Sequence, residues 1–203
     1  YLYFQNLQFV IEENQLFSMV DEAHSTGVIG KTGHGIREYW QEKRQVDILM
    51  GTFSKSIGGE GGYVAGETRL INYLRNVARG FIFSTSLSPV TMAANLAGIE
   101  VLEKEISRVT KLQYNVKYFC TQLGKYGINV KSETAIIPVI IGDEENALTV
   151  SNYLYENGYF ISAIRYPTVA KGAARLRVAL MSSHTEAELK KCAELIGKAL
   201  LMK

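Results

Sequence analysis

Cysteine, proline and net charge are all scarce in this chain of 203 residues, which has two cysteines, three prolines and a formal net charge of +2. Cys120 and Cys192 have no paired spacing, so they form neither a disulfide framework nor a metal motif, and a reducing, cytoplasmic compartment is expected. A charge so close to balance gives no electrostatic reason to expect nucleic acid or an anionic membrane surface as a partner.

Long apolar runs are missing as well. No stretch approaches the roughly 18 apolar residues that a membrane-spanning helix requires, and no signal peptide is visible. Hydrophobic residues make up 47% of the chain and charged residues 21%, which are ordinary values for a globular protein. Leu2–Gln5 matches the core of a protease site left by expression tags, so residues 1–5 are kept out of the fold prediction.

Glycine, by contrast, is plentiful, and many of the 18 glycines lie in the stretch Gly51–Gly66 around Lys55. The apolar run Val46–Met50 precedes this stretch and is typical of a buried strand. Glycines let the backbone turn through conformations closed to other residues and approach a ligand closely. A solvated surface lysine needs no such neighbours, whereas a desolvated lysine loses its charge readily and its free amine condenses with carbonyl compounds. These surroundings predict a chemical role for Lys55.

A second polar cluster follows another predicted strand, Leu16–Val20. In open α/β sheets, ligands bind just beyond the carboxyl ends of the strands, so we expect Asp21 and His24 to face the site. Pyridoxal phosphate chemistry needs a lysine and an acid that keeps the pyridine nitrogen of the cofactor protonated. Asp21 is suited to that role, and His24 could donate a hydrogen bond to the phenolic oxygen of the ring.

Hydroxyl side chains and arginines complete the candidate site. Thr52 and Ser54 beside Lys55, together with Ser84–Ser86 after the predicted strand Phe81–Phe83, offer hydroxyls to a phosphate, which needs several hydrogen-bond donors. Arginine alternates with an apolar residue from Arg175 into the predicted strand Leu176–Leu180. Because successive side chains of a strand point to opposite faces, the two arginines are expected to share one face of the sheet. They are Arg175 and Arg177.

The order of the predicted elements indicates an α/β fold in two parts, divided near Glu105. Residues 1–105 are interpreted as part of a large domain with a mostly parallel sheet and helices, and residues 106–203 as a small C-terminal α/β domain with β-α-β-β-α order. The other predicted strands are Asp47–Thr52, Tyr63–Ala65, Ile136–Ile141 and Tyr159–Ile164. The predicted helices are Asn6–Asn14, Ile36–Trp40, Thr68–Val77, Pro89–Glu105, Ser107–Lys125, Glu144–Asn157 and Thr185–Leu201. Gly158 is expected to close the helix Glu144–Asn157 as its C-cap.

Several stretches in the same order resemble the α-oxoamine synthases, and the resemblance extends from Leu16 to the C-terminal region. These stretches are Val20–Gly27, Gly51–Ser56, Gly61–Tyr63, Ser84–Pro89 and Ala174–Val178. The α-oxoamine synthases are fold-type I pyridoxal phosphate enzymes of the aminotransferase-like fold, among them 8-amino-7-oxononanoate synthase of biotin biosynthesis and serine palmitoyltransferase of sphingolipid biosynthesis. The resemblance does not decide between these two types.

The resemblance implies a role for each candidate residue. Lys55 would form the internal aldimine with pyridoxal 5'-phosphate, Asp21 would pair with the pyridine nitrogen and His24 with the phenolic oxygen. Thr52, with Ser54 beside it, would contact the phosphate. Thr85 would reach the phosphate of the neighbouring subunit, which implies a homodimer with shared active sites.

The resemblance also implies the reaction. Arg177, with Arg175 as a second candidate, would hold the carboxylate of an amino acid in a bidentate clamp, a task suited to the planar guanidinium. Lys55 would remove the α-proton, and the resulting carbanion would attack an acyl-CoA thioester with loss of coenzyme A and carbon dioxide. No metal is expected.

The departures from the family pattern raise a further expectation. Family members are considerably longer, and the part without a counterpart precedes Asp21 and includes an aromatic residue that stacks on the cofactor. The chain is therefore expected to be a fragment of such an enzyme, and its activity by itself is in question. Two other functions stay open, a different fold-type I enzyme such as an aminotransferase or lyase and a non-catalytic partner subunit, although such subunits typically lack the lysine.

Overall fold

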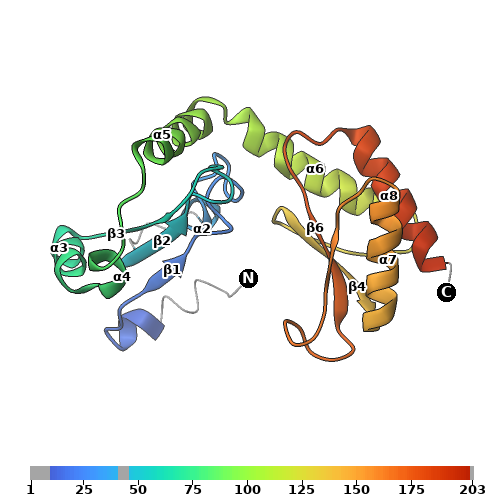
Figure 1. Ribbon diagram of the computed structural model, residues 1–203, viewed down its shortest axis with the longest axis horizontal. Coiled ribbons are helices and arrows are strands. Elements are labelled where there is room, and N and C mark those ends of the chain that lie inside the picture. The colour runs from blue at the N-terminus through green and yellow to red at the C-terminus, as the bar shows by residue number, and fades with distance from the viewer. Residues whose placement is uncertain (1–9, 41–45, 202–203) are drawn as a thin grey trace. The chain divides into compact units, whose positions relative to one another are not determined.

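The computed structural model describes residues 10–40 and 46–201, and these form two compact units (Figure 1). The first unit ends at Val109 and the second begins at Thr110, a few residues beyond the boundary expected near Glu105. We describe each unit by itself. The helix predicted over Asn6–Asn14 lies partly outside the described residues, and residues 1–5 lie wholly outside them.

The first unit contains a three-stranded sheet in the order β1-β2-β3, formed by β1 (Met19–Asp21), β2 (Ile48–Thr52) and β3 (Gly62–Gly66). β1 runs parallel to β2, whereas β3 runs antiparallel to it. The antiparallel pairing follows from the short loop between β2 and β3, because a short connection returns the chain beside the strand it has just left. The described part of this sheet is therefore mixed, with the carboxyl ends of β1 and β2 at one edge.

Residues 10–13 of the first unit are helical. Its helices with both bounds among the described residues are α2 (Ile36–Trp40), α3 (Thr68–Val77), α4 (Arg79–Ile82) and α5 (Pro89–Lys104). The bounds of α2 and α3 are those predicted from the sequence. Ser88 caps α5, since its hydroxyl accepts a 3.2 Å hydrogen bond from the backbone N–H of Thr91. Pro89 occupies the first turn, where its missing N–H costs nothing.

The prediction of a strand at Phe81–Phe83 is wrong. The backbone N–H groups of Phe81 and Ile82 both donate to the carbonyl of Ala78 at 2.9 Å, which makes this stretch the short helix α4 and its end. Its apolar side chains suggested a strand, but no strand among the described residues pairs with it. The side chains of Phe81 and Phe83 are 65% and 78% exposed. The hydroxyl-rich segment 84–88 therefore follows a helix.

The second unit combines an antiparallel sheet with three helices. The sheet has the order β4-β6-β5, from β4 (Ile136–Gly142), β5 (Ser162–Ile164) and β6 (Ala174–Ala179). The helices are α6 (Ser107–Gly124), α7 (Glu144–Glu156) and α8 (Glu186–Leu201). The β-α-β-β-α order predicted for this part of the chain is confirmed.

The core of the second unit lies between its sheet and its helices, and α7 contacts all three strands as well as α8. Its most deeply buried side chains include Phe119, Leu123, Ile137, Leu154, Leu176 and Ile196. Thr185 and Glu188 form a capping box at the start of α8, in which each residue's side chain accepts a hydrogen bond from the other's backbone N–H. Gly158, at φ +86°, follows the end of α7, as predicted. No helix in the described ranges is both long enough and apolar enough to cross a membrane.

Candidate functional site

Asp21 and Thr52 lie on the same face of the first sheet, at the edge where β1 and β2 end. Asp21 pairs with Met50 in the parallel register, and Thr52 is two residues further along β2. Because paired residues point to the same face and side chains alternate along a strand, Asp21, Met50 and Thr52 share one face. The Asp21 carboxylate accepts a 2.8 Å hydrogen bond from the backbone N–H of Ala23 and is otherwise exposed.

Lys55 lies on an ordered loop, residues 53–61, which connects β2 to β3 and which we call the lysine loop. Its backbone bonds across itself: the N–H of Phe53 donates to the carbonyl of Gly61 at 3.0 Å, and the N–H of Gly59 donates to the carbonyl of Phe53 at 2.8 Å. Gly61 has φ +95°, a conformation that glycine adopts without strain. The Lys55 side chain is exposed at this loop, so the desolvated lysine expected from the sequence is not found in the described part of the chain. The predicted need for glycine here is confirmed.

Two hydroxyls gather at the start of the lysine loop. The Thr52 hydroxyl donates to the carbonyl of Gly61 at 2.9 Å, and the Ser54 hydroxyl lies 2.8 Å from the Thr52 hydroxyl. The backbone N–H of Ser54 also donates to the Thr52 hydroxyl at 3.2 Å. Thr52 is thereby fixed in place, while the Ser54 side chain stays exposed and can turn toward a ligand.

Hydrogen bonds join the lysine loop to the segment that follows Asp21. The Ser56 hydroxyl donates to the backbone carbonyl of Thr26 at 2.6 Å, and the Tyr63 hydroxyl lies 3.2 Å from the Thr26 hydroxyl. The ring of Tyr63 also packs against Phe53, with 5.3 Å between ring centroids. The structure thus brings together two motifs about thirty residues apart, and Tyr63 packs beside the lysine loop.

Helix α5 holds the far side of the lysine loop through a residue that the sequence reasoning missed. The buried amide of Asn95 accepts from the backbone N–H of Glu60 at 3.1 Å and donates to the carbonyl of Glu60 at 2.9 Å. The signal was present, because Asn95 is an isolated amide in the largely apolar helix Pro89–Lys104 and a buried amide needs polar partners.

Glu22 is a second residue whose importance the sequence reasoning did not identify. Its side chain is only 2% exposed, and burial raises the pKa of its carboxyl, an effect that the hydrogen bond from the Ile36 N–H and the nearby Arg37 oppose. The motif contains this carboxylate between Asp21 and His24, but nothing in the letters distinguishes a buried carboxylate from an exposed one.

The remaining predicted site residues lie in three other parts of the chain: the turn after β1, the segment between α4 and α5, and strand β6. His24 is exposed in the turn after Asp21, and Thr85 is exposed between α4 and α5. Arg175 and Arg177 lie on one face of β6, opposite the buried side chains of Ala174, Leu176 and Val178, so the predicted shared face is confirmed. Both arginines belong to the second unit, and their relation to Lys55 stays a prediction.

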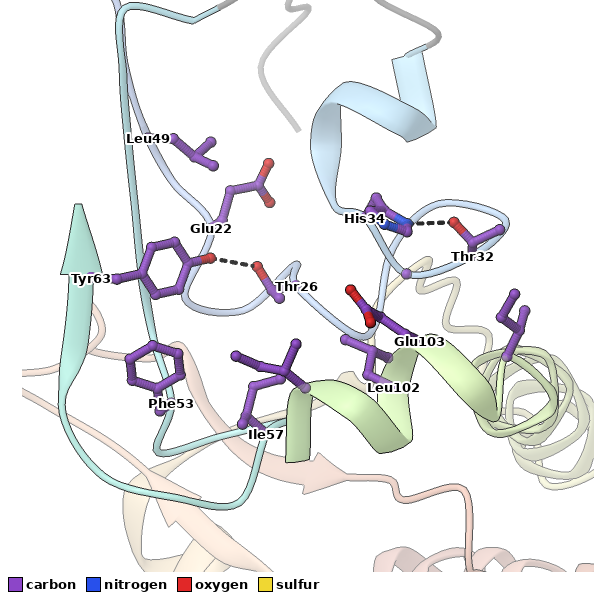
Figure 2. A pocket seen from close by; sticks show the side chains of 13 residues that line it. Glu22, Thr26, Thr32, His34, Leu49, Phe53, Ile57, Tyr63, Leu102 and Glu103 are labelled. Carbon is purple, nitrogen blue, oxygen red and sulfur yellow. Dashed lines mark hydrogen bonds between the residues drawn. The ribbon is translucent and has the colours of Figure 1, made fainter. Parts of the chain in front are cut away.

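A cavity of about 460 Å³ lies within the first unit (Figure 2). The strand register places its lining residues Leu49 and Tyr63 on the opposite face of the sheet from Asp21 and Thr52. Leu49 and Tyr63 line it from the sheet, Phe53 and Ile57 from the lysine loop, and Leu102 from α5. None of the predicted site residues lines it. Asp21 and Thr52 therefore lie outside this cavity, at the ends of β1 and β2. Within the described ranges, no group of three or more His, Cys, Asp and Glu side chains could hold a metal ion.

The sequence and the structure both have counterparts among known proteins. The chain is 44% identical over 189 residues to 8-amino-7-oxononanoate synthase 1 of Bacillus velezensis, an alignment that covers 93% of this chain and 48% of that protein. The chain spans about half the length of the curated relatives that it matches.

Two solved structures share the fold. A high-resolution structure of SPT with PLP internal aldimine superposes with a TM-score of 0.91 at 28% identity, covering 97% of this chain and 50% of that one. The 8-amino-7-oxononanoate synthase of Francisella tularensis gives a TM-score of 0.81 at 27% identity, covering 97% and 58%.

The α/β architecture and this aminotransferase-like likeness confirm the fold class predicted from the sequence. The family described as aminotransferase class I and II matches residues 4–196, nearly the whole chain. The chain belongs to the aminotransferase class I and II family.

Proposed function

We propose that this chain is part of a pyridoxal phosphate-dependent acyltransferase that condenses an amino acid with an acyl-CoA and releases carbon dioxide. One observation carries the proposal. Asp21 and Thr52 share a sheet face and edge, and the loop that carries Lys55 begins at Thr52 and is hydrogen-bonded to the segment after Asp21. This arrangement supports an acid, a hydroxyl and an amine that act at one edge of the sheet.

The residues present fit the cofactor. Asp21 would hold the proton on the pyridine nitrogen, and His24 would donate to the phenolic oxygen. The Ser54 hydroxyl would donate to the phosphate, and the Thr52 hydroxyl would do so after turning away from the carbonyl of Gly61, to which it donates in this structure. Pyridoxal phosphate, when bound, supplies an electron sink that stabilises negative charge on the α-carbon of an amino acid. The amine of Lys55 would bind the cofactor carbonyl in the resting enzyme and move the α-proton during the reaction.

The second unit would supply the contact with the amino acid. The guanidinium of Arg177 presents parallel N–H donors that match a carboxylate. Arg177 is exposed, whereas the Nε of Arg175 already donates to the carbonyl of Ala173 at 3.0 Å. This difference favours Arg177 as the carboxylate clamp and leaves Arg175 as its neighbour on the same face.

The curated relatives at 42–44% identity are named 8-amino-7-oxononanoate synthase, and they favour that type over the serine palmitoyltransferase type. The product name indicates the two substrates. An amine on the eighth carbon beside a terminal methyl would come from alanine, and a ketone on the seventh carbon would come from a seven-carbon dicarboxylic acyl thioester. Alanine and that acyl-CoA are the substrates that we propose.

The domain, subunit and location assignments are part of the same proposal. The first unit would belong to the large cofactor-binding domain, and the second would be the small domain. The enzyme would be a cytoplasmic homodimer in which Thr85 contacts the phosphate bound by the neighbouring subunit. The exposed apolar side chains around this residue, Phe83 and Val90, are 78% and 80% exposed and support a covered surface there.

The test is the absorbance band of the lysine-linked cofactor in the purified protein. We expect the band in the wild type and its loss in Lys55→Ala. Lys31→Ala is a matched control, because Lys31 is also exposed in a glycine-rich loop of the first unit, and this variant should keep the band. A band that survives Lys55→Ala would overturn the proposal.

The substrate assignment has its own assay. The wild type is offered alanine, glycine or serine with the seven-carbon dicarboxylic acyl-CoA or with a long-chain acyl-CoA, and released coenzyme A is measured. Turnover of alanine with the dicarboxylic donor supports the 8-amino-7-oxononanoate synthase type. Turnover of serine with the long-chain donor would instead support the serine palmitoyltransferase type.

A further inference from the structure

The turn after β1 is built around the buried carboxylate of Glu22. Glu22 directly follows Asp21 and precedes His24 by two residues, yet its side chain lies on the cavity wall with Leu49 and Tyr63 (Figure 2). The strand register places this wall on the other face of the sheet from Asp21. Carboxylates are rarely this buried unless hydrogen bonds satisfy them. The contacts of Glu22 therefore need an explanation.

Both the side chain and the backbone of Glu22 are hydrogen-bonded. The carboxylate accepts from the Ser25 hydroxyl and from the backbone N–H of Ile36, which lies 2.9 Å from Oε1 and 3.2 Å from Oε2. The backbone carbonyl of Glu22 accepts from the N–H groups of Ser25 and Thr26, each at 3.0 Å. Its own N–H donates to the carbonyl of Met50 at 2.7 Å and so extends the pairing of β1 with β2 by one residue.

Tight packing fixes the far end of the loop against the same carboxylate. Gly35 has φ +83°, and a Cβ at this position would lie 2.4 Å from Oε2 of Glu22. The backbone before α2 can therefore approach the carboxylate only because Gly35 has no side chain. Glu22 thus links the end of β1, the turn that carries His24 and the start of α2.

We propose that Glu22 is a positioning residue of the cofactor site: its carboxylate, by binding Ser25 and Ile36, fixes the turn that presents Asp21 and His24. This inference rests on the proposed function, because it concerns the geometry of the cofactor-binding side chains. Glu22 lies on the opposite sheet face from Asp21, so it acts through the turn and not by contact with the cofactor. Burying a carboxylate is costly, and a fully bonded buried polar group makes the local geometry unique.

Three substitutions separate positioning from simple filling of space. Glu22→Ala removes the acceptors, and Glu22→Asp keeps the charge but is one methylene too short to reach both Ser25 and Ile36. Glu22→Gln keeps the length, and its amide can accept from Ile36 and donate to the Ser25 hydroxyl. We expect the first two variants to bind pyridoxal phosphate at least tenfold more weakly than the wild type, and Glu22→Gln to bind it within about threefold of the wild type.

The measurements are the dissociation constant of pyridoxal phosphate, the pH titration of the bound cofactor's absorbance, and the melting midpoint of the cofactor-free protein. Asn115→Ala is the matched control, because Asn115 is a fully buried polar residue of the second unit that donates to the carbonyls of Met181 and His184 at 3.0 Å each. It should lower the melting midpoint and leave the cofactor affinity and the pH titration unchanged. Glu22→Asp should shift the pH titration as well as the affinity.

The outcomes are distinguishable. If Glu22→Ala does not fold, Glu22→Asp decides the question, since it retains the charge and most of the volume. Wild-type affinity and a wild-type pH titration in Glu22→Asp would overturn the positioning role while leaving the Lys55-dependent band intact. Loss of that band's dependence on Lys55 would instead overturn the proposed function, and the positioning role would fall with it.

Discussion

The hydroxyl of Ser56 donates a 2.6 Å hydrogen bond to the backbone carbonyl of Thr26 and so joins the lysine loop to the segment after β1. Ser56 is the immediate neighbour of Lys55, and Thr26 lies two residues beyond His24. The position of the amine therefore depends on the motif that carries the acid and the imidazole. This contact links the stretches Val20–Gly27 and Gly51–Ser56 in the fold, although neither sequence by itself indicates the contact.

Removing this contact should loosen the lysine loop without unfolding the unit. Ser56→Ala deletes one hydrogen bond, which should cost about 1 kcal/mol of unfolding free energy, measured by urea denaturation. Gly27→Ala should cost more, because its Cβ would lie 2.7 Å from the Ser56 Cβ at a backbone φ of +74°. Equal stability of the two variants would contradict this account of the loop contact.

Helix α5 should tolerate no side chain at the position where it meets the lysine loop. A Cβ on Gly98 would lie 2.4 Å from the backbone carbonyl oxygen of Ile57, so Gly98→Ala must push the loop or the helix away. We expect a loss of about 1–3 kcal/mol, as in other overpacked sites, measured by urea denaturation. Gly80→Ala is the control, because nothing lies within 4 Å of a Cβ there and alanine favours helix α4. A destabilised control would refute the steric explanation.

The sequence was sufficient for elements whose signals are local. Pro89 after Ser88 marks the start of α5, Gly158 marks the end of α7, and the alternation around Arg177 marks its strand, and all three are confirmed. The stretch Phe81–Phe83 misled, since three apolar residues suit a strand or a helix equally well and only the backbone hydrogen bonds to Ala78 decide between them.

The site was predictable only in part, for a physical reason. Chemistry restricts which side chains can serve as the amine and its acid partner, so Lys55 and Asp21 stand out as residue types. Glu22 and Asn95 instead act by satisfying backbone groups of segments distant in the chain. Which carbonyl or N–H lies beside them depends on the tertiary fold, and no spacing in the sequence encodes it.

The buried thiol of Cys192 should make stability fall at alkaline pH. Burial raises the pKa of Cys192 to about 12, whereas a cysteine in the unfolded chain titrates near 8.5. The folded state therefore keeps a proton that the unfolded state loses, so the stability contributed by this group is complete below about pH 8.5 and declines as the pH rises toward 12. Between pH 8 and pH 10 the wild type should lose about 2 kcal/mol relative to Cys192→Ala, measured by urea denaturation at each pH. If the difference in unfolding free energy between the wild type and Cys192→Ala does not change with pH, the raised pKa of Cys192 is contradicted.

Mixed subunits test whether active sites are shared in the proposed homodimer. Thr85 is exposed beside Phe83 and Val90, so its hydroxyl is free to reach a neighbouring subunit. If it does, Lys55→Ala and Thr85→Ala homodimers are each impaired at every site. A heterodimer of the two, however, has one site with both substitutions and one site with neither. Co-expression with different affinity tags and purification of the mixed dimer should restore about half of the cofactor binding and activity per dimer.

The same experiment has a clear opposite result, because the mixed dimer contains no intact site if Thr85 contacts the phosphate of its own subunit. Each mixed dimer would then contain one site lacking Lys55 and one lacking Thr85, and its activity would equal the mean of the two parent homodimers. A control mixture of Lys55→Ala with Lys31→Ala should retain one normal site under either arrangement, since Lys31 has no part in the site. Recovery above the parental mean in the Lys55/Thr85 mixture alone therefore identifies Thr85 as a residue that acts across the subunit boundary.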